Sequence, residues 1–102
     1  MKKRFIICLD APVTPNQPQA LLDFLRAKGY GWWHWFPNTW LVVDNSGTLN
    51  HTVLRDIAKI AYPGAFLLVL ELPEGMNGRW SGFGIASGPQ DQFKWIQEQW
   101  DT

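Results

Sequence analysis

The chain has 102 residues, enough for one compact domain and too few for two. Its nine basic and nine acidic residues cancel, which argues against a protein that binds long nucleic acids mainly by neutralising phosphates. The single cysteine excludes a disulfide framework and a zinc site built from four thiolates.

We expect residues 1–102 to form a single domain in the cytoplasm. No apolar run approaches the roughly 20 residues that span a bilayer, so we expect no membrane partner. The apolar stretch after the basic start, Phe5 to Leu9, is too short for a signal peptide. The unusual feature is the aromatic content, which includes seven tryptophans.

The first half of the chain predicts a strand, a helix and a hairpin. Residues 5–9 form a continuous apolar run, typical of a central strand covered on both faces. Apolar residues recur at helical spacing over 21–28, and Gly29 is suited to ending that helix. Residues 32–36 and 39–43 are aromatic or β-branched and flank a Pro-Asn break, which predicts a β-hairpin.

The second half predicts a helix, a strand and a terminal helix. Thr48 can cap the first of these helices. Its apolar stripe consists of Leu49, Val53, Ile57, Ile60 and Ala61. Residues 66–70 form a second apolar strand, which Pro73 closes. A final helix is expected to open near residues 87–89, with Phe93, Ile96 and Trp100 on one face.

This order predicts an α+β fold, a ferredoxin-like βαββαβ sandwich with an extra C-terminal helix. Two helices can cover only one face of such a sheet. The other face would expose about half of the apolar residues of the first and last strands, more than a monomer usually tolerates. We therefore predict that the terminal helix and a second copy of the chain together cover it, in a homodimer.

The string YGWWHWFPNTWLVV at residues 30–43 resembles the small SinR-family proteins, which are distinct from the helix-turn-helix repressor of that name. These proteins look like relatives of the smaller CRISPR spacer-acquisition subunit and of VapD-type toxins. The resemblance covers most of the chain. Its other motifs are Ile6–Asp10, Leu54-Arg55-Asp56, Leu67–Val69, Trp80–Phe83 and Lys94-Trp95-Ile96.

The resemblance implies a ferredoxin-like homodimer in which Asp10 of each protomer faces its copy across the two-fold axis. Such a pair of carboxylates would suit magnesium or manganese. The alternative is that Asp10 accepts backbone N–H groups in its own loop. Residues 11–18 contain no Lys or Arg to hold a phosphate. We therefore expect a binding protein rather than an enzyme, with a divalent-metal-dependent nuclease as the alternative.

Three residues are the candidates for contacting a ligand. Arg79 and Trp80 pair a guanidinium with an indole, a combination that can hold a phosphate and a base. His34 would supply an acid, a base or a stacking surface, or would simply be hydrogen-bonded at the sheet surface. Alternation places His34 with Trp32 and Phe36 on one face of the hairpin, and Trp33 with Trp35 on the other.

The tryptophans have two interpretations, because aromatic side chains stack on bases and also fill cores and interfaces. Cys8, within an apolar strand, is expected in the core. Together these observations predict a small homodimer that binds a nucleotide or a short nucleic acid, in phage or bacterial defence or counter-defence. The alternatives are a metal-dependent ribonuclease or toxin that uses paired Asp10, and a protein-interaction inhibitor whose exposed aromatic residues contact a protein target.

Overall fold

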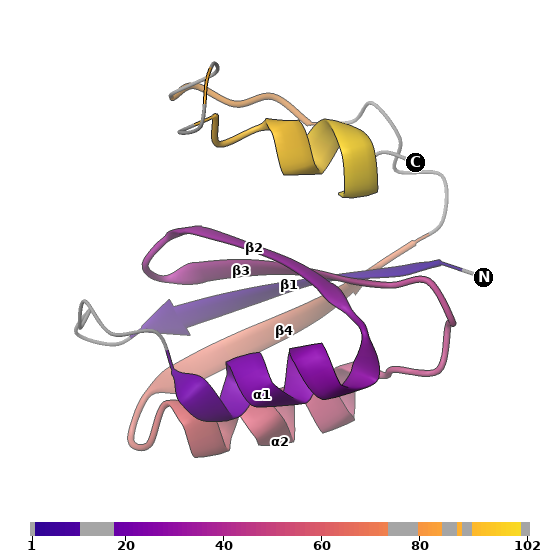
Figure 1. Ribbon diagram of the computed structural model, residues 1–102. Helices are drawn as coiled ribbons and strands as arrows, with labels where there is room; N and C mark the ends of the chain where they lie inside the picture. The colour runs from indigo at the N-terminus through magenta and orange to yellow at the C-terminus, as the bar shows by residue number, and fades with distance from the viewer. Residues whose placement is uncertain (1, 11–17, 74–79, 85–87, 89–90, 101–102) are drawn as a thin grey trace.

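The computed structural model describes residues 2–10, 18–73, 80–84, 88 and 91–100. The elements, in chain order, are β1 (Lys3–Asp10), α1 (Gln19–Lys28), β2 (Gly31–Phe36), β3 (Thr39–Asp44), α2 (His51–Ala61), β4 (Phe66–Leu72) and a C-terminal helix of π geometry (Ile96–Trp100). The strands form one antiparallel sheet in the order β2-β3-β1-β4. Helices α1 and α2 lie on one face and the C-terminal helix lies on the other (Figure 1). The predicted α+β class is therefore confirmed.

Strand β1 lies in the middle of the sheet, as its apolar sequence predicts. It pairs with β3 on one side and with β4 on the other, so that Ile6 lies between Leu41 and Leu70. Its two faces differ in burial, because Phe5 and Ile7 are fully buried against the helices while Cys8 is exposed on the opposite face. The prediction that Cys8 belongs to the core was wrong.

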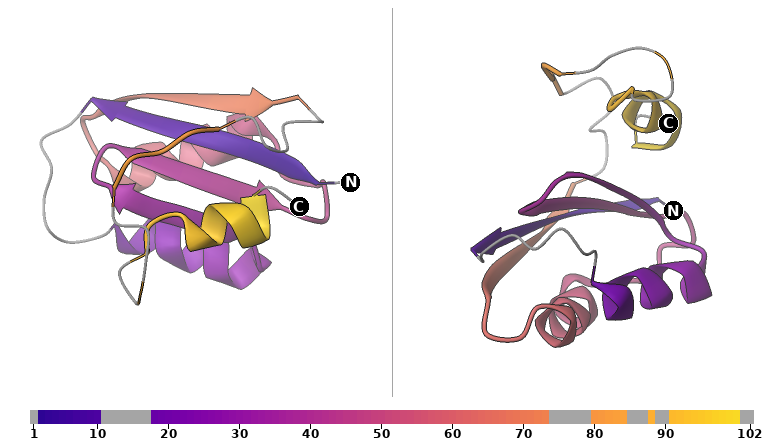
Figure 2. Two further views of the ribbon diagram at one scale, coloured as in Figure 1. Left: turned by 90° about the horizontal axis from the view of Figure 1, so that it is seen from above. Right: turned by 60° about the vertical axis from the view of Figure 1, so that its left-hand side comes forward.

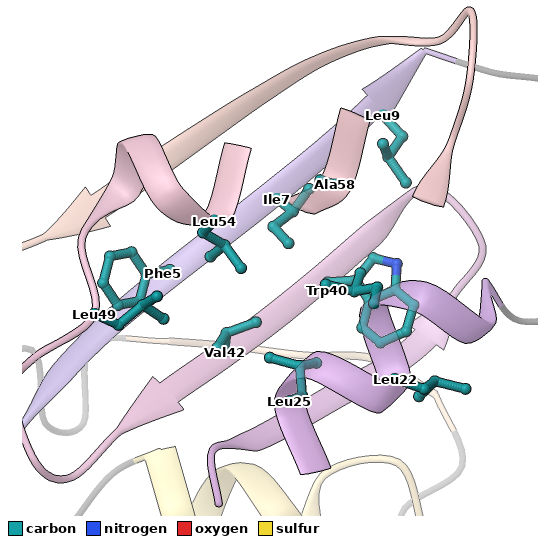
Figure 3. Packing of buried hydrophobic residues seen from close by; sticks show 11 residues of the cluster. Phe5, Ile7, Leu9, Leu22, Leu25, Trp40, Val42, Leu49, Leu54 and Ala58 are labelled. Atoms are coloured by element: carbon teal, nitrogen blue, oxygen red, sulfur yellow. The ribbon is translucent and has the colours of Figure 1, made fainter. Parts of the chain in front are cut away.

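The main core lies between the sheet and the two long helices (Figure 3). Helix α1 buries Leu21, Leu22 and Leu25 and ends, as predicted, at Gly29. The backbone of Gly29 is left-handed, with φ of 71°, a conformation that glycine adopts without strain. The other buried members of this core are Phe5, Ile7, Leu9, Trp40, Val42, Leu49, Leu54 and Ala58.

Helix α2 differs from its prediction in both its cap and its buried face. The cap is Asn50 rather than Thr48, and its side chain accepts a hydrogen bond from the backbone N–H of Val53. Leu54 and Ala58 face the core, while Val53 and Ile60 are exposed. The stripe with Val53 and Ile60 and the stripe with Leu54 and Ala58 both have helical spacing, so periodicity alone does not indicate which of them is buried.

The C-terminal segment packs on the second face of the sheet. Phe93, Ile96 and Trp100 are buried, as predicted, in a smaller core with Trp33 and Val43. Helical residues run from Lys94 to Trp100, while most of the predicted opening near residues 87–89 lies outside the described residues.

Polar and steric contacts tie this segment to the sheet. Arg4 Nε donates to the carbonyl of Trp100 at 2.6 Å, and Trp33 Nε1 donates to the carbonyl of Gln92. The segment that contains Gly82 passes so close to Phe93 that a Cβ at Gly82 would lie 2.5 Å from the ring. The terminal helix therefore forms a layer that packs against the second face of the sheet.

This layer leaves part of the second face uncovered. Seen from above, the C-terminal helix lies over the β2 side of the sheet, and β4 lies at the opposite edge (Figure 2). On β4, Phe66 is 79% exposed, Leu68 56% and Leu70 44%. We call these three residues, together with Cys8, the open apolar face, because Cys8 pairs with Leu68 in register.

Candidate functional site: a tryptophan pocket at the sheet edge

A pocket of about 340 Å³ lies along β2, and the described residues that line it are aromatic or imidazole. We call it the tryptophan pocket, and its walls are Trp32, Trp33, His34, Trp35 and Trp95. Strand β2 is at the edge of the sheet, and among the described residues no further strand pairs with its outer side. The volume lies in the range of small-molecule sites, which are mostly apolar with a few placed polar groups.

Trp33 anchors one wall of the pocket. Its indole N–H is bonded to the carbonyl of Gln92, and its ring packs edge-to-face against Phe36 with the centroids 4.9 Å apart. The pairing of β2 with β3 is irregular between Trp33 and Phe36. This irregularity brings Phe36 to the side of Trp33, so the prediction that Phe36 shares a face with His34 was wrong.

Trp32 and Trp95 form further walls. The Arg26 guanidinium lies over the Trp32 ring, 5.6 Å from its centroid, in cation–π geometry. Trp95 lies against Gly31, where a Cβ would be 3.4 Å from its ring. The tryptophans are thus held by groups from α1, β2 and the C-terminal segment.

Among the described residues that line the pocket, His34 has the most polar side chain. Its ring stacks on Trp40, with the centroids 3.8 Å apart and the planes 10° from parallel. Its Nδ1 lies 3.0 Å from the carbonyl oxygen of Thr39. Because a carbonyl only accepts, Nδ1 carries the proton of the neutral ring, and Nε2 is left as a hydrogen-bond acceptor.

The electrostatics favour this neutral form. Burial lowers the pKa of His34, and the Thr39 carbonyl, which favours the charged form, offsets only part of that effect. Behind the histidine, Trp40 Nε1 donates to the hydroxyl of Tyr62 at 2.9 Å, and burial raises the pKa of Tyr62. The pocket therefore offers aromatic faces and an uncharged acceptor, which can hold a flat heterocycle that carries N–H donors.

One of the two residues expected to join His34 is described, and it lies elsewhere. Trp80 stacks on Phe93, with the centroids 6.0 Å apart, and packs against the smaller core, outside the walls of the pocket. Arg79 lies outside the described residues. Of the three predicted ligand residues, the structure places only His34 at the pocket.

Asp10 is exposed at the end of β1, where its register partner on β4 is Phe66. It is on the same face as Cys8, two residues earlier in the strand. Within the part of the chain that the structure describes, no three His, Cys, Asp or Glu side chains are grouped to hold a metal ion. A magnesium or manganese site at paired Asp10 stays a prediction.

Sequence reasoning missed Trp95 and Arg26 as neighbours of this site. The density of tryptophan in residues 32–40 pointed to β2, but nothing in the sequence indicates that Trp95, about 60 residues away, completes the wall.

No helix among the described residues is both long and apolar enough to cross a bilayer. Comparisons with protein-family models, with curated proteins and with solved structures find no significant match to this chain.

Proposed function

We propose that the chain is a homodimeric protein with a ferredoxin-like fold that binds a nucleotide or a short nucleic acid and has no turnover of its own. The observation that carries this proposal is the tryptophan pocket, which is lined by four indoles and a neutral histidine. A base that stacks on an aromatic side chain gains about 1–3 kcal/mol, whichever base it is.

The fold supports the first part of this proposal. Strand order β2-β3-β1-β4, with α1 and α2 side by side on one face, is the arrangement expected of a ferredoxin-like split βαβ sandwich. This is also the fold of the families that the sequence resembles, so the resemblance and the topology support the same proposal.

The charge balance limits the kind of ligand. With nine basic and nine acidic residues, the chain lacks the surplus charge that long duplex nucleic acid requires. The pocket at the edge of β2 instead fits a single flat ring, whose N–H groups would donate to Nε2 of His34. We therefore propose that the ligand is small or single-stranded.

The open apolar face supports the homodimer. Three large side chains of β4 are exposed beside Cys8, on a strand whose outer edge is unpaired in the described sheet. A second copy seated on this face would bury them. The same observation favours a second candidate function, a protein-interaction module whose partner is a different protein.

Calorimetric titration with nucleosides, nucleotides and a short single strand tests the ligand. Trp35→Ala should weaken binding about fivefold or more, because it removes one stacking surface from the pocket. Phe83→Ala is the matched control, since Phe83 is a fully exposed aromatic residue outside the pocket. Absence of binding to every one of these ligands would move the assignment to the protein-interaction function.

A further inference from the structure

One exposed cation lies directly against the wall of the tryptophan pocket. Arg26 is in the last turn of α1, and its guanidinium covers the ring of Trp32 at 5.6 Å. Within the described residues, the Arg26 guanidinium contacts the Trp32 ring and forms no ion pair. The five N–H donors of the guanidinium therefore remain available to an anion.

We propose that Arg26 holds the phosphate of a nucleotide whose base occupies the tryptophan pocket. The ligand class is then a flat heterocycle that carries an anionic group, such as a nucleoside 5′-monophosphate or the phosphorylated end of a short strand. This inference rests on the proposed function and adds to it the residue that recognises the phosphate.

Two features favour Arg26 over Lys94 as the residue that binds the phosphate. Lys94 adjoins Trp95 in sequence, but its ammonium lies 3.8 Å from the carboxylate of Glu98, in an ion pair. The planar guanidinium of arginine also binds phosphate through two parallel N–H groups, whereas lysine acts as a point charge. The contact with Trp32 restrains the guanidinium before a ligand arrives, so less side-chain entropy is lost on binding.

The test compares a nucleoside with its 5′-monophosphate on three proteins, by calorimetry at low salt. The unmodified chain should bind the monophosphate about fivefold more tightly than the nucleoside, the size expected for an exposed ion pair. Arg26→Gln should remove that preference and lower the monophosphate affinity more than the nucleoside affinity. Arg55→Gln is the matched control, because Arg55 is an exposed arginine on α2, paired with Asp56 at 2.9 Å, and its loss makes the same change in net charge.

The outcomes separate this inference from the proposed function. A monophosphate preference that survives Arg26→Gln overturns the role of Arg26 and leaves base binding intact. Equal weakening of both ligands in Arg26→Gln also overturns it, because Arg26 would then act only by supporting Trp32. If neither ligand binds the unmodified chain, the proposed function and this inference fail together.

A second comparison distinguishes the sources of the phosphate. A five-nucleotide single strand is titrated with and without a 5′-phosphate, beside the free monophosphate. Stronger binding of the phosphorylated strand, lost in Arg26→Gln, assigns the site to strand ends. A preference confined to the free monophosphate assigns it to mononucleotides. Equal affinity of the unmodified chain for each phosphorylated ligand and its unphosphorylated counterpart would overturn the proposal.

Discussion

Replacing Leu68 with glutamate should separate the proposed dimer into monomers without unfolding the chain. Leu68 is in the open apolar face, where the exposed side chains of Phe66 and Leu70 flank it along β4 and its register partner Cys8 lies opposite it on β1. Because more than half of Leu68 is in contact with solvent in a single chain, a carboxylate there points into water and costs the monomer little. In a dimer that covers this face, the same carboxylate would be buried.

The size of the effect follows from the exposed fractions of the three β4 side chains, 79%, 56% and 44%. Burying what remains exposed of them contributes about 3–5 kcal/mol per protomer, at roughly 1.5–3 kcal/mol for a whole side chain. Two protomers then gain about 5–11 kcal/mol from these side chains alone. A micromolar dimer needs about 8 kcal/mol beyond the cost of association, about 4–15 kcal/mol, so the rest of the interface must contribute the remainder. Losing both Leu68 side chains and burying two carboxylates should therefore weaken the dimer more than about a hundredfold.

Light scattering at micromolar concentration measures this directly. The unmodified chain should have about twice its 11.7 kDa mass. Leu68→Glu should have the monomer mass and still unfold in one cooperative transition, at a lower melting temperature because the dimer no longer stabilises the folded chain. Ile60→Glu is the control, since Ile60 is 67% exposed on α2, away from the open apolar face, and should remain dimeric. A monomeric unmodified chain, or a Leu68→Glu variant that keeps the dimer mass, would refute the reasoning.

Three further predictions concern single polar residues. Asp10→Asn should leave nucleotide affinity and stability unchanged; magnesium- or manganese-dependent RNA cleavage by the unmodified chain, lost in Asp10→Asn, would instead support the nuclease alternative. Asp44→Asn should cost about 2 kcal/mol in urea denaturation, because the buried Asp44 carboxylate accepts hydrogen bonds from Ser46 and Leu49. Burial alone would raise the pKa of Asp44, but these hydrogen bonds outweigh it and lower the pKa. Their contribution to the free energy of unfolding should therefore fade as the pH falls below about 3.8. If Asp44→Asn leaves the dependence of stability on acid pH unaltered, this prediction is contradicted. Burial lowers the pKa of His34 in the folded chain, so as the pH falls the histidine is protonated in the unfolded chain first. The free energy of unfolding of the unmodified chain should therefore decline below about pH 6.5, and this decline should be absent in His34→Gln.

The regular elements could be predicted from local sequence, because each has a local cause. The continuous apolar run of β1 predicts a central strand, and Gly29 marks the end of α1 through its left-handed backbone. The buried face of α2 was predicted wrongly because Ile57 and Ala61 belong to both possible stripes. Only packing against the sheet selects Leu54 and Ala58 over Val53 and Ile60.

The site was harder to predict because it depends on contacts between distant segments. His34 could be chosen from its position within the tryptophan-rich hairpin, and it does line the pocket. Trp95 reaches the same pocket only because the C-terminal segment folds back over the β2 side of the sheet. The irregular pairing between Trp33 and Phe36 also changes which side chains share a face, and simple alternation gives no sign of it.

The central claim is that a base binds in the tryptophan pocket, and the indole N–H signals of the seven tryptophans test it most directly. In a two-dimensional NMR titration with a nucleoside monophosphate, the indole signals of Trp32, Trp33, Trp35 and Trp95 should show the largest shifts, because these rings line the pocket. The signal of Trp80, which stacks on Phe93 and does not line the pocket, should shift much less. Shifts confined to Trp80, or no shift at any indole at saturating ligand, would contradict the claim.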